Sequence, residues 1–308
     1  MVMSEDEPSF PERSPVAVDI QLARRLIDTQ FPEWAGLPLR AVEINGWDNR
    51  TFRLGAQLTV RLPSGQWYAL QVAKEQQWLP RLAPELPLPI PEPVAEEIPG
   101  QSYPYPWSVY RWIDGRVAHE TGISDFSEFA TALARFLKAL HRIDPSGGPA
   151  PGKHNWHRGA APSVYAAETI DAIDALGSEI PGDAVRRIWD HAVDSRWQGD
   201  PVWFHGDVAT GNLLTRDGSL SAVIDFGSSG VGDPACDLAI AWTFFDRAAR
   251  DAFRAALGVD QATWSRGRGW ALWKALISLV DALEHNPGAA AGPRRDLRRL
   301  LDDFGASD

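Results

Sequence analysis

The sequence predicts an α+β fold of two lobes, in which a β-rich N-terminal lobe precedes a mainly helical C-terminal lobe. The chain has 308 residues, which exceeds a typical single domain and predicts two lobes with a cleft between them. Residues 39–62 form short strand-like runs separated by turns, whereas apolar residues after position 124 recur at helical spacing. Clefts of this kind commonly hold ligands, so we expect the functional site there.

The N-terminal lobe is expected to begin with a helix over residues 18–31, where apolar residues recur at helical spacing. Three strands with turns between them follow at residues 39–44, 50–54 and 58–62. In the third strand, the alternation of side chains places Arg61 on the face opposite Val60. A helix over about 69–79 comes next and carries Glu75.

The segment 79–106 is dense in proline, which by composition alone suggests a linker, but apolar residues are interspersed in it. A strand is predicted at 107–113, and the pattern beyond it is mainly helical. Ser124 is the predicted N-cap of a helix with a single apolar stripe over 126–140. Further helices are predicted near 163–176, 183–193, 234–245, 248–257 and 264–284.

The composition argues against several classes of protein. A single cysteine, Cys236, rules out an intramolecular disulfide and a cysteine zinc cluster, which fits a reducing cytoplasm. Residues 1–15 are acidic and proline-rich, lack the apolar region of a signal peptide and are expected to be disordered, and no run elsewhere approaches a membrane span. A net charge of −11 argues against nucleic acid as the main partner and agrees with a cationic substrate.

In the most informative stretch, Asp207 lies five residues before Asn212. After a short gap, Asp225 begins an Asp-Phe-Gly sequence. The residues between, 213–224, alternate around an Asp-Gly turn and predict a β-hairpin that brings Asn212 near Asp225. A hard dication takes oxygen ligands, so this amide and carboxylate make a candidate Mg²⁺ site. Asp207 is left to receive a substrate hydroxyl, and the three groups together are what phosphoryl transfer needs.

These residues closely resemble the aminoglycoside phosphotransferase family of small-molecule kinases, a branch of the protein-kinase-like fold, and the resemblance covers most of the chain. Three family motifs occur in order: His-Gly-Asp-x-x-x-x-Asn at 205–212, Ile-Asp-Phe-Gly at 224–227, and Gly-Asp-Pro with Asp-Leu-Ala within 232–239. The resemblance implies a protein-kinase-like fold with an N-lobe over 16–113 and a C-lobe over 114–308. The C-lobe would then carry the catalytic loop and the acceptor site.

The resemblance also implies roles for single residues. Asp207 is expected to be the catalytic base, while Asn212 and Asp225 hold Mg²⁺. His205 is expected to brace the backbone of the catalytic loop, because the role of base is already filled. Asp237 is expected to start a buried helix and to tie that helix to the catalytic loop.

In the N-lobe, Arg61 lies where the family carries its phosphate-contacting basic residue, and Glu75 resembles the ion-pair partner of that residue. An arginine can grip phosphate in a bidentate fork, so Arg61 can replace the commoner lysine. The alternative is that Arg61 and Glu75 are solvated surface charges. The loop 45–49, which ends at Asn49, occupies the position of the nucleotide loop but has a single glycine, and we count Asn49 among the nucleotide-binding residues.

By the same resemblance, residues 110–114 form the hinge between the lobes. The carbonyl of Arg111 and the amide of Ile113 are expected to meet the adenine edge, with Tyr110 flanking the pocket. The alternative is an ordinary buried edge strand.

The acceptor is expected to be a small molecule. Eleven residues separate Asp225 from Asp237, too few for a long peptide-binding segment, and Gly206 stands where many protein kinases have arginine. The leading hypothesis is Mg²⁺-dependent transfer of the γ-phosphoryl group of ATP or GTP to a hydroxyl of an aminoglycoside-type antibiotic. Acidic candidates for contacting the amines of such a substrate are Asp281, Glu284, Asp302 and Asp303.

Other hypotheses stay open. The acceptor could be a macrolide or a metabolite that is not an antibiotic, and the altered glycine loop also allows a catalytically silent nucleotide-binding protein. A metal-dependent phosphohydrolase could be built on His205, Asp207, Asp225 and Asp233. Three tryptophans are assigned to the core, with a sugar pocket as the alternative: Trp242, Trp270 and Trp273.

Overall fold

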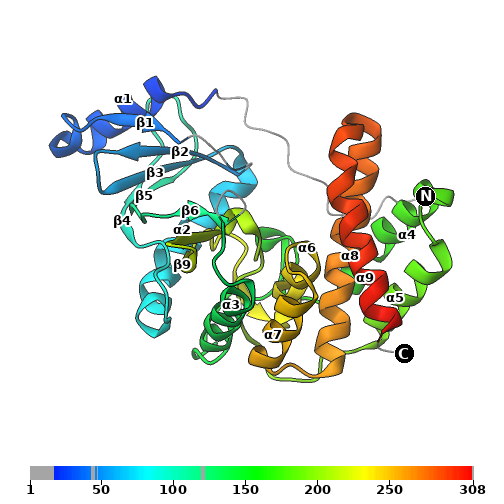
Figure 1. The fold of residues 1–308 in the computed structure, drawn as a ribbon. Helices are drawn as coiled ribbons and strands as arrows, with labels where there is room; N and C mark the ends of the chain where they lie inside the picture. Colours follow the sequence, from blue (N-terminus) through cyan, green and yellow to red (C-terminus); the bar gives the residue numbers. More distant parts are fainter. Residues whose placement is uncertain (1–16, 43–45, 47, 119–121, 307–308) are drawn as a thin grey trace.

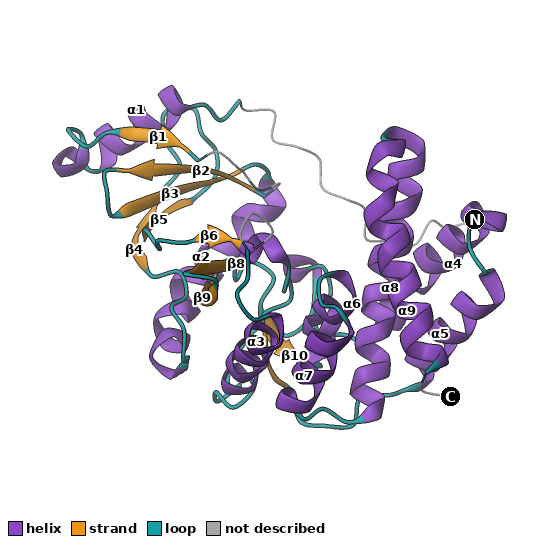
Figure 2. Cartoon of the chain, viewed as in Figure 1, coloured by secondary structure: helices purple, strands orange, loops and turns teal. Residues whose placement is uncertain are grey.

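The computed structural model describes residues 17–42, 46, 48–118 and 122–306. One end of the molecule holds a β-sheet with the first helix, and the other end is built almost wholly of helices (Figure 1). Colouring by secondary structure separates the two regions clearly (Figure 2). The predicted two-lobed α+β architecture is therefore confirmed.

The N-terminal lobe is an antiparallel sheet of five strands in the order β1-β2-β3-β5-β4. Its elements are α1 (Ile20–Gln30), β1 (Leu39–Ala41), β2 (Asn49–Leu54), β3 (Leu58–Pro63), α2 (Gln66–Leu82), β4 (Pro93–Glu97) and β5 (Trp107–Arg111). Asp19 caps α1 by accepting a hydrogen bond from the Leu22 amide at 2.7 Å. The predicted first helix and three strands are present, although β1 ends at Ala41 and the predicted turn at 45–46 falls partly outside the described residues.

β5 lies between β3 and β4, so it is a central strand and the edge-strand alternative is wrong. All but the last of its residues are buried. The proline-dense segment before it is not a simple linker, because it contributes β4 and the buried Ile90. Tertiary packing has therefore ordered a segment whose composition alone favours an extended, solvated chain.

The C-terminal lobe holds six α-helices longer than four residues among its described residues. Its elements are β6 (Arg116–Val117), α3 (Phe126–Leu140), α4 (Ala166–Leu176), α5 (Gly182–Asp194), β7 (Val202–Phe204), β8 (Leu213–Arg216), β9 (Ser219–Val223), β10 (Gly230–Gly232), α6 (Ile240–Thr243), α7 (Arg247–Leu257), α8 (Gln261–His285) and α9 (Ala291–Gly305). The long helix α8 runs through this lobe with α4, α5 and α9 beside it (Figure 1).

Three details differ from the sequence predictions. Asp125, not Ser124, caps α3, because its carboxylate accepts a hydrogen bond from the Glu128 amide at 2.9 Å. The predicted helix over 234–245 is a 3₁₀ helix, Pro234–Ala239, followed by the short α6. Helix α9 was not predicted, because its sequence is dominated by charged residues and buries only Leu297 and Leu300.

The buried apolar residues form two clusters. The smaller cluster joins α1 to β2, β3 and β5 in the N-terminal lobe. The larger one joins the helices of the C-terminal lobe and also includes the C-terminal half of α2, through Trp78, Leu79 and Leu82. Helix α2 also contacts β3, β4 and β5 of the sheet, so it packs against both lobes and its polar residues lie at their junction.

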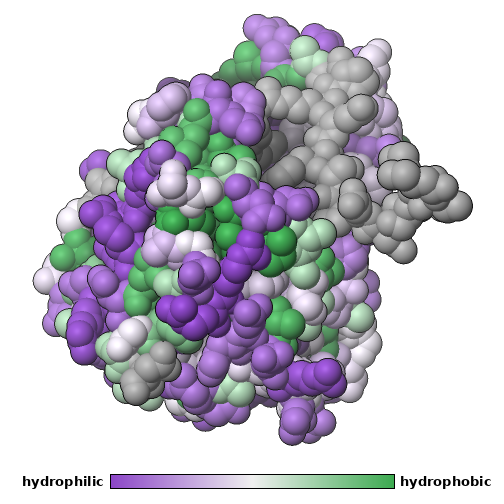
Figure 3. Space-filling model, turned by 90° about the vertical axis from the view of Figure 1, so that its right-hand side faces the viewer, coloured by the Kyte–Doolittle hydropathy of each residue, from purple (hydrophilic) through white to green (hydrophobic). Residues whose placement is uncertain are grey.

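The surface carries few large apolar side chains. On the face shown in Figure 3, hydrophobic residues are interspersed among hydrophilic ones. The exposed large apolar residues among those described are Leu37, Trp67, Leu70, Val94 and Ile98. None of the described helices combines the length and the hydropathy that crossing a membrane requires.

Candidate active site

The catalytic loop follows β7, and the predicted hairpin follows the loop. β8 pairs with β9 in antiparallel register, with Leu213 opposite Val223. Immediately beyond this pair, the Ile224 amide donates a hydrogen bond to the Asn212 carbonyl at 2.9 Å. The hairpin therefore fixes Asn212 beside the residue that precedes Asp225, as the sequence pattern predicts.

The side chains of Asp207 and Asn212 are joined directly. Asn212 Nδ2 donates hydrogen bonds to the Asp207 carbonyl and to Asp207 Oδ2, each at 2.9 Å. Because both bonds use the amide nitrogen, Oδ1 is the Asn212 atom that is left to serve as a cation ligand.

His205 and Asp237 hold the backbone of the catalytic loop. Asp237 is fully buried and accepts hydrogen bonds from the amides of His205 at 2.8 Å and Gly206 at 2.7 Å. The imidazole of His205 accepts from the Asp207 amide at Nδ1, at 3.2 Å, and lies 3.0 Å from the Ile224 carbonyl at Nε2. These contacts require the neutral tautomer with its proton on Nε2, and they connect the loop to the strand before Asp225.

The loop also requires a glycine at position 206. Gly206 has φ of +87°, and a Cβ placed on it would lie 2.3 Å from the carbonyl oxygen of Ser228. Any larger residue would push apart the two segments that carry Asp207 and Asp225.

On the side of the N-terminal lobe, Arg61 bridges two carboxylates. Arg61 Nη1 lies 3.2 Å from Glu75 Oε2, and Nη2 lies 3.2 Å from Asp225 Oδ1. Tyr110 Oη donates to Glu75 Oε2 at 2.5 Å, so Tyr110 helps to hold the Glu75 carboxylate in place. The alternative in which Arg61 and Glu75 are solvated surface charges is wrong, since their side chains are only 14% and 4% exposed.

The neighbouring carboxylates favour the charged form of Arg61. Desolvation by itself lowers the pKa of Arg61, but the charges of Glu75 and Asp225 outweigh it and raise that pKa well above the usual value. Asp225 has φ of +65°, an unusual conformation for a residue other than glycine, and residues held in this way cluster at functional sites.

Two further residues belong to this region and were not assigned roles from the sequence. Lys74 on α2 donates hydrogen bonds to the carbonyls of Gly227 at 2.5 Å and Ser229 at 3.0 Å. Asp48 lies close enough to Asp225 that burial, together with that charge, raises its pKa to about 7. The sequence pattern does not distinguish Lys74 from the other charged residues near it, so only its burial and its contacts reveal its role.

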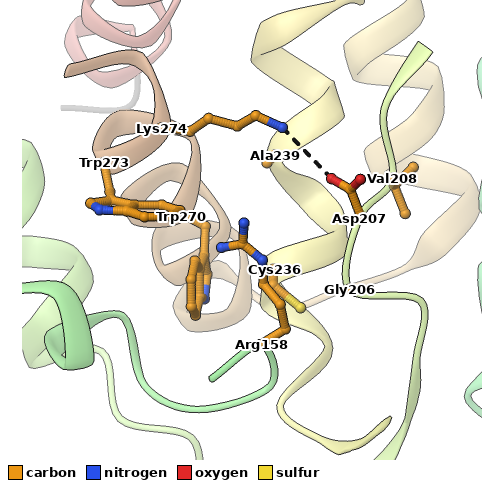
Figure 4. A pocket seen from close by; sticks show the side chains of 9 residues that line it. All are labelled: Arg158, Gly206, Asp207, Val208, Cys236, Ala239, Trp270, Trp273 and Lys274. Atoms are coloured by element: carbon orange, nitrogen blue, oxygen red, sulfur yellow. Dashed lines mark ion pairs between the residues drawn. The ribbon is translucent and has the colours of Figure 1, made fainter. Parts of the chain in front are cut away.

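On the opposite side, Asp207 faces a pocket of about 270 Å³ of empty space, part of it open to solvent. The pocket is lined by Arg158, Gly206, Asp207, Val208, Cys236, Ala239, Trp270, Trp273 and Lys274 (Figure 4). Lys274 Nζ lies 3.7 Å from Asp207 Oδ1. Desolvation raises the pKa of Asp207, but the positive charges of Lys274 and Arg158 outweigh it and hold that pKa below its usual value.

The remaining predicted residues lie elsewhere. Arg111 ends β5 with its guanidinium paired to Glu92 at 3.1 Å, Ile113 follows β5 on the way to β6, and Asn49 is buried at the start of β2. Among the described residues, none of the three is joined by a hydrogen bond or ion pair to Asp207 or Asp225. Their predicted contacts with a nucleotide stay predictions.

The acidic residues predicted to meet substrate amines are not gathered at the pocket. Asp303 is partly buried and pairs with Arg268 and Arg250, and Asp281 is 78% exposed and pairs with His285. Trp242 is fully buried in the core, whereas Trp270 and Trp273 belong to the core and also line the pocket.

The donor set suits a magnesium ion bound together with phosphates. Over the described ranges, no three His, Cys, Asp or Glu side chains lie where they could hold a metal by themselves. Magnesium is usually bound through one or two carboxylates with substrate phosphates and waters, and Asn212 and Asp225 fit that pattern. The phosphohydrolase alternative fits less well, because Asp233 is buried in an ion pair with Arg266, with Arg266 Nε 2.6 Å from Asp233 Oδ2.

Comparison with known proteins places the chain in a family. The model of the phosphotransferase enzyme family (APH) matches residues 40–270. No curated protein matches this sequence.

Solved structures are similar over almost the whole chain. The GDP complex of wild-type aminoglycoside 2'-phosphotransferase-IIIa is 18% identical with a TM-score of 0.67, over 92% of this chain and 98% of that chain. The streptomycin-ATP-APH(2")-IIa ternary complex is 17% identical with a TM-score of 0.59, over 92% and 97%. Macrolide 2'-phosphotransferase type I is 21% identical with a TM-score of 0.61, over 92% and 98%. At these identities the likeness shows that the chain has the protein-kinase-like fold of these proteins.

Proposed function

This chain belongs to the phosphotransferase enzyme family, and on that premise we propose that it transfers the γ-phosphoryl group of ATP or GTP to a hydroxyl of a small molecule. The observation that carries the proposal is the link between Asp207, Asn212 and the strand before Asp225. The Asp207 carboxylate faces an open pocket and is bonded to Asn212, and the hairpin after the loop holds Asn212 next to the residue before Asp225, so that an amide oxygen and a carboxylate can serve as cation ligands beside it. Positioning of this kind is most of what a phosphoryl-transfer enzyme contributes.

In the proposed reaction, the acceptor hydroxyl hydrogen-bonds to Asp207 in the pocket. The hydroxyl oxygen forms a bond to the γ-phosphorus, the bond from that phosphorus to the bridging oxygen breaks, and the nucleoside diphosphate leaves. Asp207 takes the hydroxyl proton. Its lowered pKa keeps the carboxylate ionised at neutral pH, so it can orient the hydroxyl before the proton moves.

Asn212 and Asp225 are proposed to hold Mg²⁺, which would neutralise charge on the phosphates when bound. Arg61 is proposed to contact the phosphates from the N-terminal lobe while Glu75 holds its guanidinium in place. The backbones of Arg111 and Ile113 are proposed to meet the adenine, and Asn49 to support the nucleotide loop. GDP and ATP in the names of two similar structures support a nucleotide donor without deciding between ATP and GTP.

For the acceptor, the sequence favours an aminoglycoside-type antibiotic, with a macrolide or an ordinary metabolite as the alternative. The named relatives include both aminoglycoside and macrolide phosphotransferases, so their names do not decide between these two classes. The charge of the pocket points to a narrower class, which is argued below.

The experiment that tests the proposal is a transfer assay. The pure protein is incubated with Mg²⁺, ATP or GTP and a panel of hydroxylated acceptors, and mass spectrometry looks for an added phosphoryl group. Asp207→Asn should lower kcat by about 10²- to 10⁴-fold, the usual contribution of a general base, with nucleotide affinity nearly unchanged. The matched control is Asp190→Asn, an exposed residue on α5, which should behave as wild type.

Equal turnover by Asp207→Asn and wild type would rule out the assigned base. Nucleotide binding without transfer to any acceptor would favour the catalytically silent alternative.

A further inference from the structure

Two cations, and no acidic cluster, surround the carboxylate that is proposed to receive the acceptor hydroxyl. In Figure 4, Lys274 approaches Asp207 from helix α8, and the guanidinium of Arg158 lies between the tryptophans and the catalytic loop. Both positive charges are near enough to lower the pKa of Asp207. Among the described residues that line this pocket, none other than Asp207 carries a negative charge.

The contact between Lys274 and Asp207 is loose. The two charged atoms are 3.7 Å apart, and the side chains are 43% and 41% exposed. Ion pairs this open contribute little free energy, so Lys274 can leave Asp207 for a ligand at small cost. An acceptor hydroxyl must come within about 3 Å of the base, which puts the rest of the molecule directly against Lys274.

Arg158 is held in the pocket by an unusual loop. The residues before it, Trp156 and His157, have φ of +54° and +52°, and Gly159 after it has φ of +82°. A Cβ on Gly159 would lie 2.1 Å from the ring of Phe204, so only glycine allows this approach. Backbone that is strained in this way persists where the surrounding structure requires it, and it clusters at functional sites.

Aromatic groups, not carboxylates, support the guanidinium. Arg158 Cζ lies 5.0 Å from the centre of the Trp270 ring and 4.9 Å from that of Trp273. Within the described part of the chain, Arg158 forms no ion pair. Its positive charge is therefore available to a ligand, because a stacked guanidinium keeps its hydrogen-bond donors.

The neighbouring carboxylates are already engaged. Glu168 Oε2 accepts a hydrogen bond from Trp273 Nε1 at 2.6 Å. Asp296 lies near Lys274, but its carboxylate pairs with Arg295 at 3.3 Å. Neither residue lines the pocket, so the charge that an acceptor meets beside Asp207 is positive.

We propose that the acceptor carries an oxyanion, a carboxylate or a phosphate, a few bonds from the hydroxyl that is phosphorylated, and that Lys274 and Arg158 bind this group. The inference rests on the proposed function and narrows its substrate class. A polycationic aminoglycoside would bring amines against two fixed positive charges, which costs binding energy. With a hydroxylated acid, the acidic group of the acceptor pairs with Lys274 in place of Asp207. The Asp207 carboxylate can then accept the hydrogen bond of the acceptor hydroxyl.

The first test compares acceptors that differ in charge. Gluconate, glucose and glucosamine form one set, and glycerol 3-phosphate and glycerol form a second, which separates carboxylate from phosphate. With Mg²⁺ and ATP or GTP, kcat/KM should be at least about tenfold higher for an acid-bearing member than for its neutral or amino counterpart. Equal or higher kcat/KM for glucosamine would overturn the inference.

Variants then test whether the pocket residues cause the preference for acid-bearing acceptors. Lys274→Glu should lower the ratio of kcat/KM for the acid-bearing acceptor to kcat/KM for glucosamine by at least about tenfold, mainly by raising KM for the acid-bearing acceptor. Arg158→Gln should act in the same direction. Lys138→Glu makes the same change of charge on α3, far along the chain from Lys274. It should leave the ratio of kcat/KM between the acceptors unchanged. The inference would also be overturned if Lys274→Glu left the ratio of kcat/KM between the acid-bearing acceptor and glucosamine unchanged.

A binding measurement keeps the two proposals apart. Ligand-observed NMR with gluconate and the metal-free protein should show binding by wild type and by Lys138→Glu, and none by Lys274→Glu. Such binding without transfer to any acceptor would contradict phosphoryl transfer and support the anion site. The anion site would be overturned if wild type bound neither gluconate nor glycerol 3-phosphate. It would also be overturned if Lys274→Glu bound them as well as wild type does, and both conclusions hold whether or not transfer occurs.

Discussion

At the scale of single residues, the site depends on carboxylates whose partners differ. Asp237 is buried against two backbone amides, Asp225 meets Arg61, and Asp207 meets the open pocket. The same side-chain chemistry therefore holds backbone at Asp237, pairs with an arginine at Asp225 and is open to a ligand at Asp207. The environment of each carboxylate, not its identity, sets its role.

Replacing Asp237 by Asn should destabilise the protein by about 1–3 kcal/mol, because one buried amide of the catalytic loop would then face an NH₂ group instead of an oxygen. Urea unfolding at pH 7 measures the loss. Asp190→Asn, which is exposed, serves as the control and should change stability little. A stability equal to that of wild type would mean that Asp237 does not hold the loop.

His141 offers a test of pH dependence at the end of α3. Burial lowers the pKa of His141 to about 4, and its Nε2 atom is buried with no hydrogen-bond partner among the described residues. An unfolded histidine titrates near 6.5, so between about pH 6.5 and 4 the unfolded chain binds a proton that the folded chain does not. Stability is therefore full above pH 6.5 and falls as the pH drops.

The expected loss from His141 at pH 5 is about 2 kcal/mol relative to pH 7. His141→Gln should remove this part of the pH dependence, as measured by urea unfolding at the two pH values. His191→Gln changes an exposed histidine on α5 and should keep the wild-type slope. If wild type, His141→Gln and His191→Gln all lost the same stability between pH 7 and pH 5, the pKa of His141 would not be lowered by burial.

At the scale of elements, α2 does more than cover the sheet. Its apolar residues pack into the larger core cluster, Glu75 holds Arg61, and Lys74 holds the carbonyls of Gly227 and Ser229. A shift of this helix would therefore move both Arg61 and the segment that carries Asp225. Hydrogen bonds and ion pairs couple the position of α2 to the proposed metal site.

Lys74→Met should weaken Mg²⁺-dependent ADP binding by about tenfold, since the loss of a charged donor to the loop is comparable to 1.4 kcal/mol. Calorimetric titration at pH 7 is suitable, because burial lowers the pKa of Lys74 to about 8 and leaves it mostly charged there. Lys138→Met is the matched control. An unchanged affinity would show that the 225–229 segment holds its geometry without Lys74.

At the scale of the whole molecule, the two lobes meet through polar contacts at the site. Arg61 of β3 reaches Asp225, and Lys74 of α2 reaches the residues that follow it. A ligand that binds at this junction contacts both lobes, so its binding energy should stabilise the whole fold.

Mg²⁺ with ADP or GDP at 100 times its Kd should therefore stabilise the protein by about 2.7 kcal/mol and raise Tm by several degrees. Asp225→Asn should lose the part of the shift that depends on Mg²⁺ and keep the part that does not. A thermal melt with and without Mg²⁺ measures both parts, with Asp190→Asn as control. The same Mg²⁺-dependent shift in Asp225→Asn would refute a metal role for Asp225.

The sequence predicted much of this architecture because its signals are local. Alternating apolar residues and an Asp-Gly turn are enough to form the hairpin that carries Asn212 to Asp225. Helix α9 was missed because its sequence is rich in charged residues and shows little apolar pattern. The segment Pro234–Ala239 was assigned to an α-helix but begins with a proline and forms the tighter turns of a 3₁₀ helix.

By itself, the sequence determined the family and predicted a catalytic loop, because the spacing of the motifs is written in a continuous stretch of chain. Only the tertiary structure decided which cations surround the loop: Lys74 from α2, Arg158 from a strained turn and Lys274 from α8. Each lies far along the chain from the carboxylate it affects, and no periodicity or turn signal reports such a contact. Tertiary packing brings each of these cations to the site, and Arg158 and Lys274 give the pocket its positive charge.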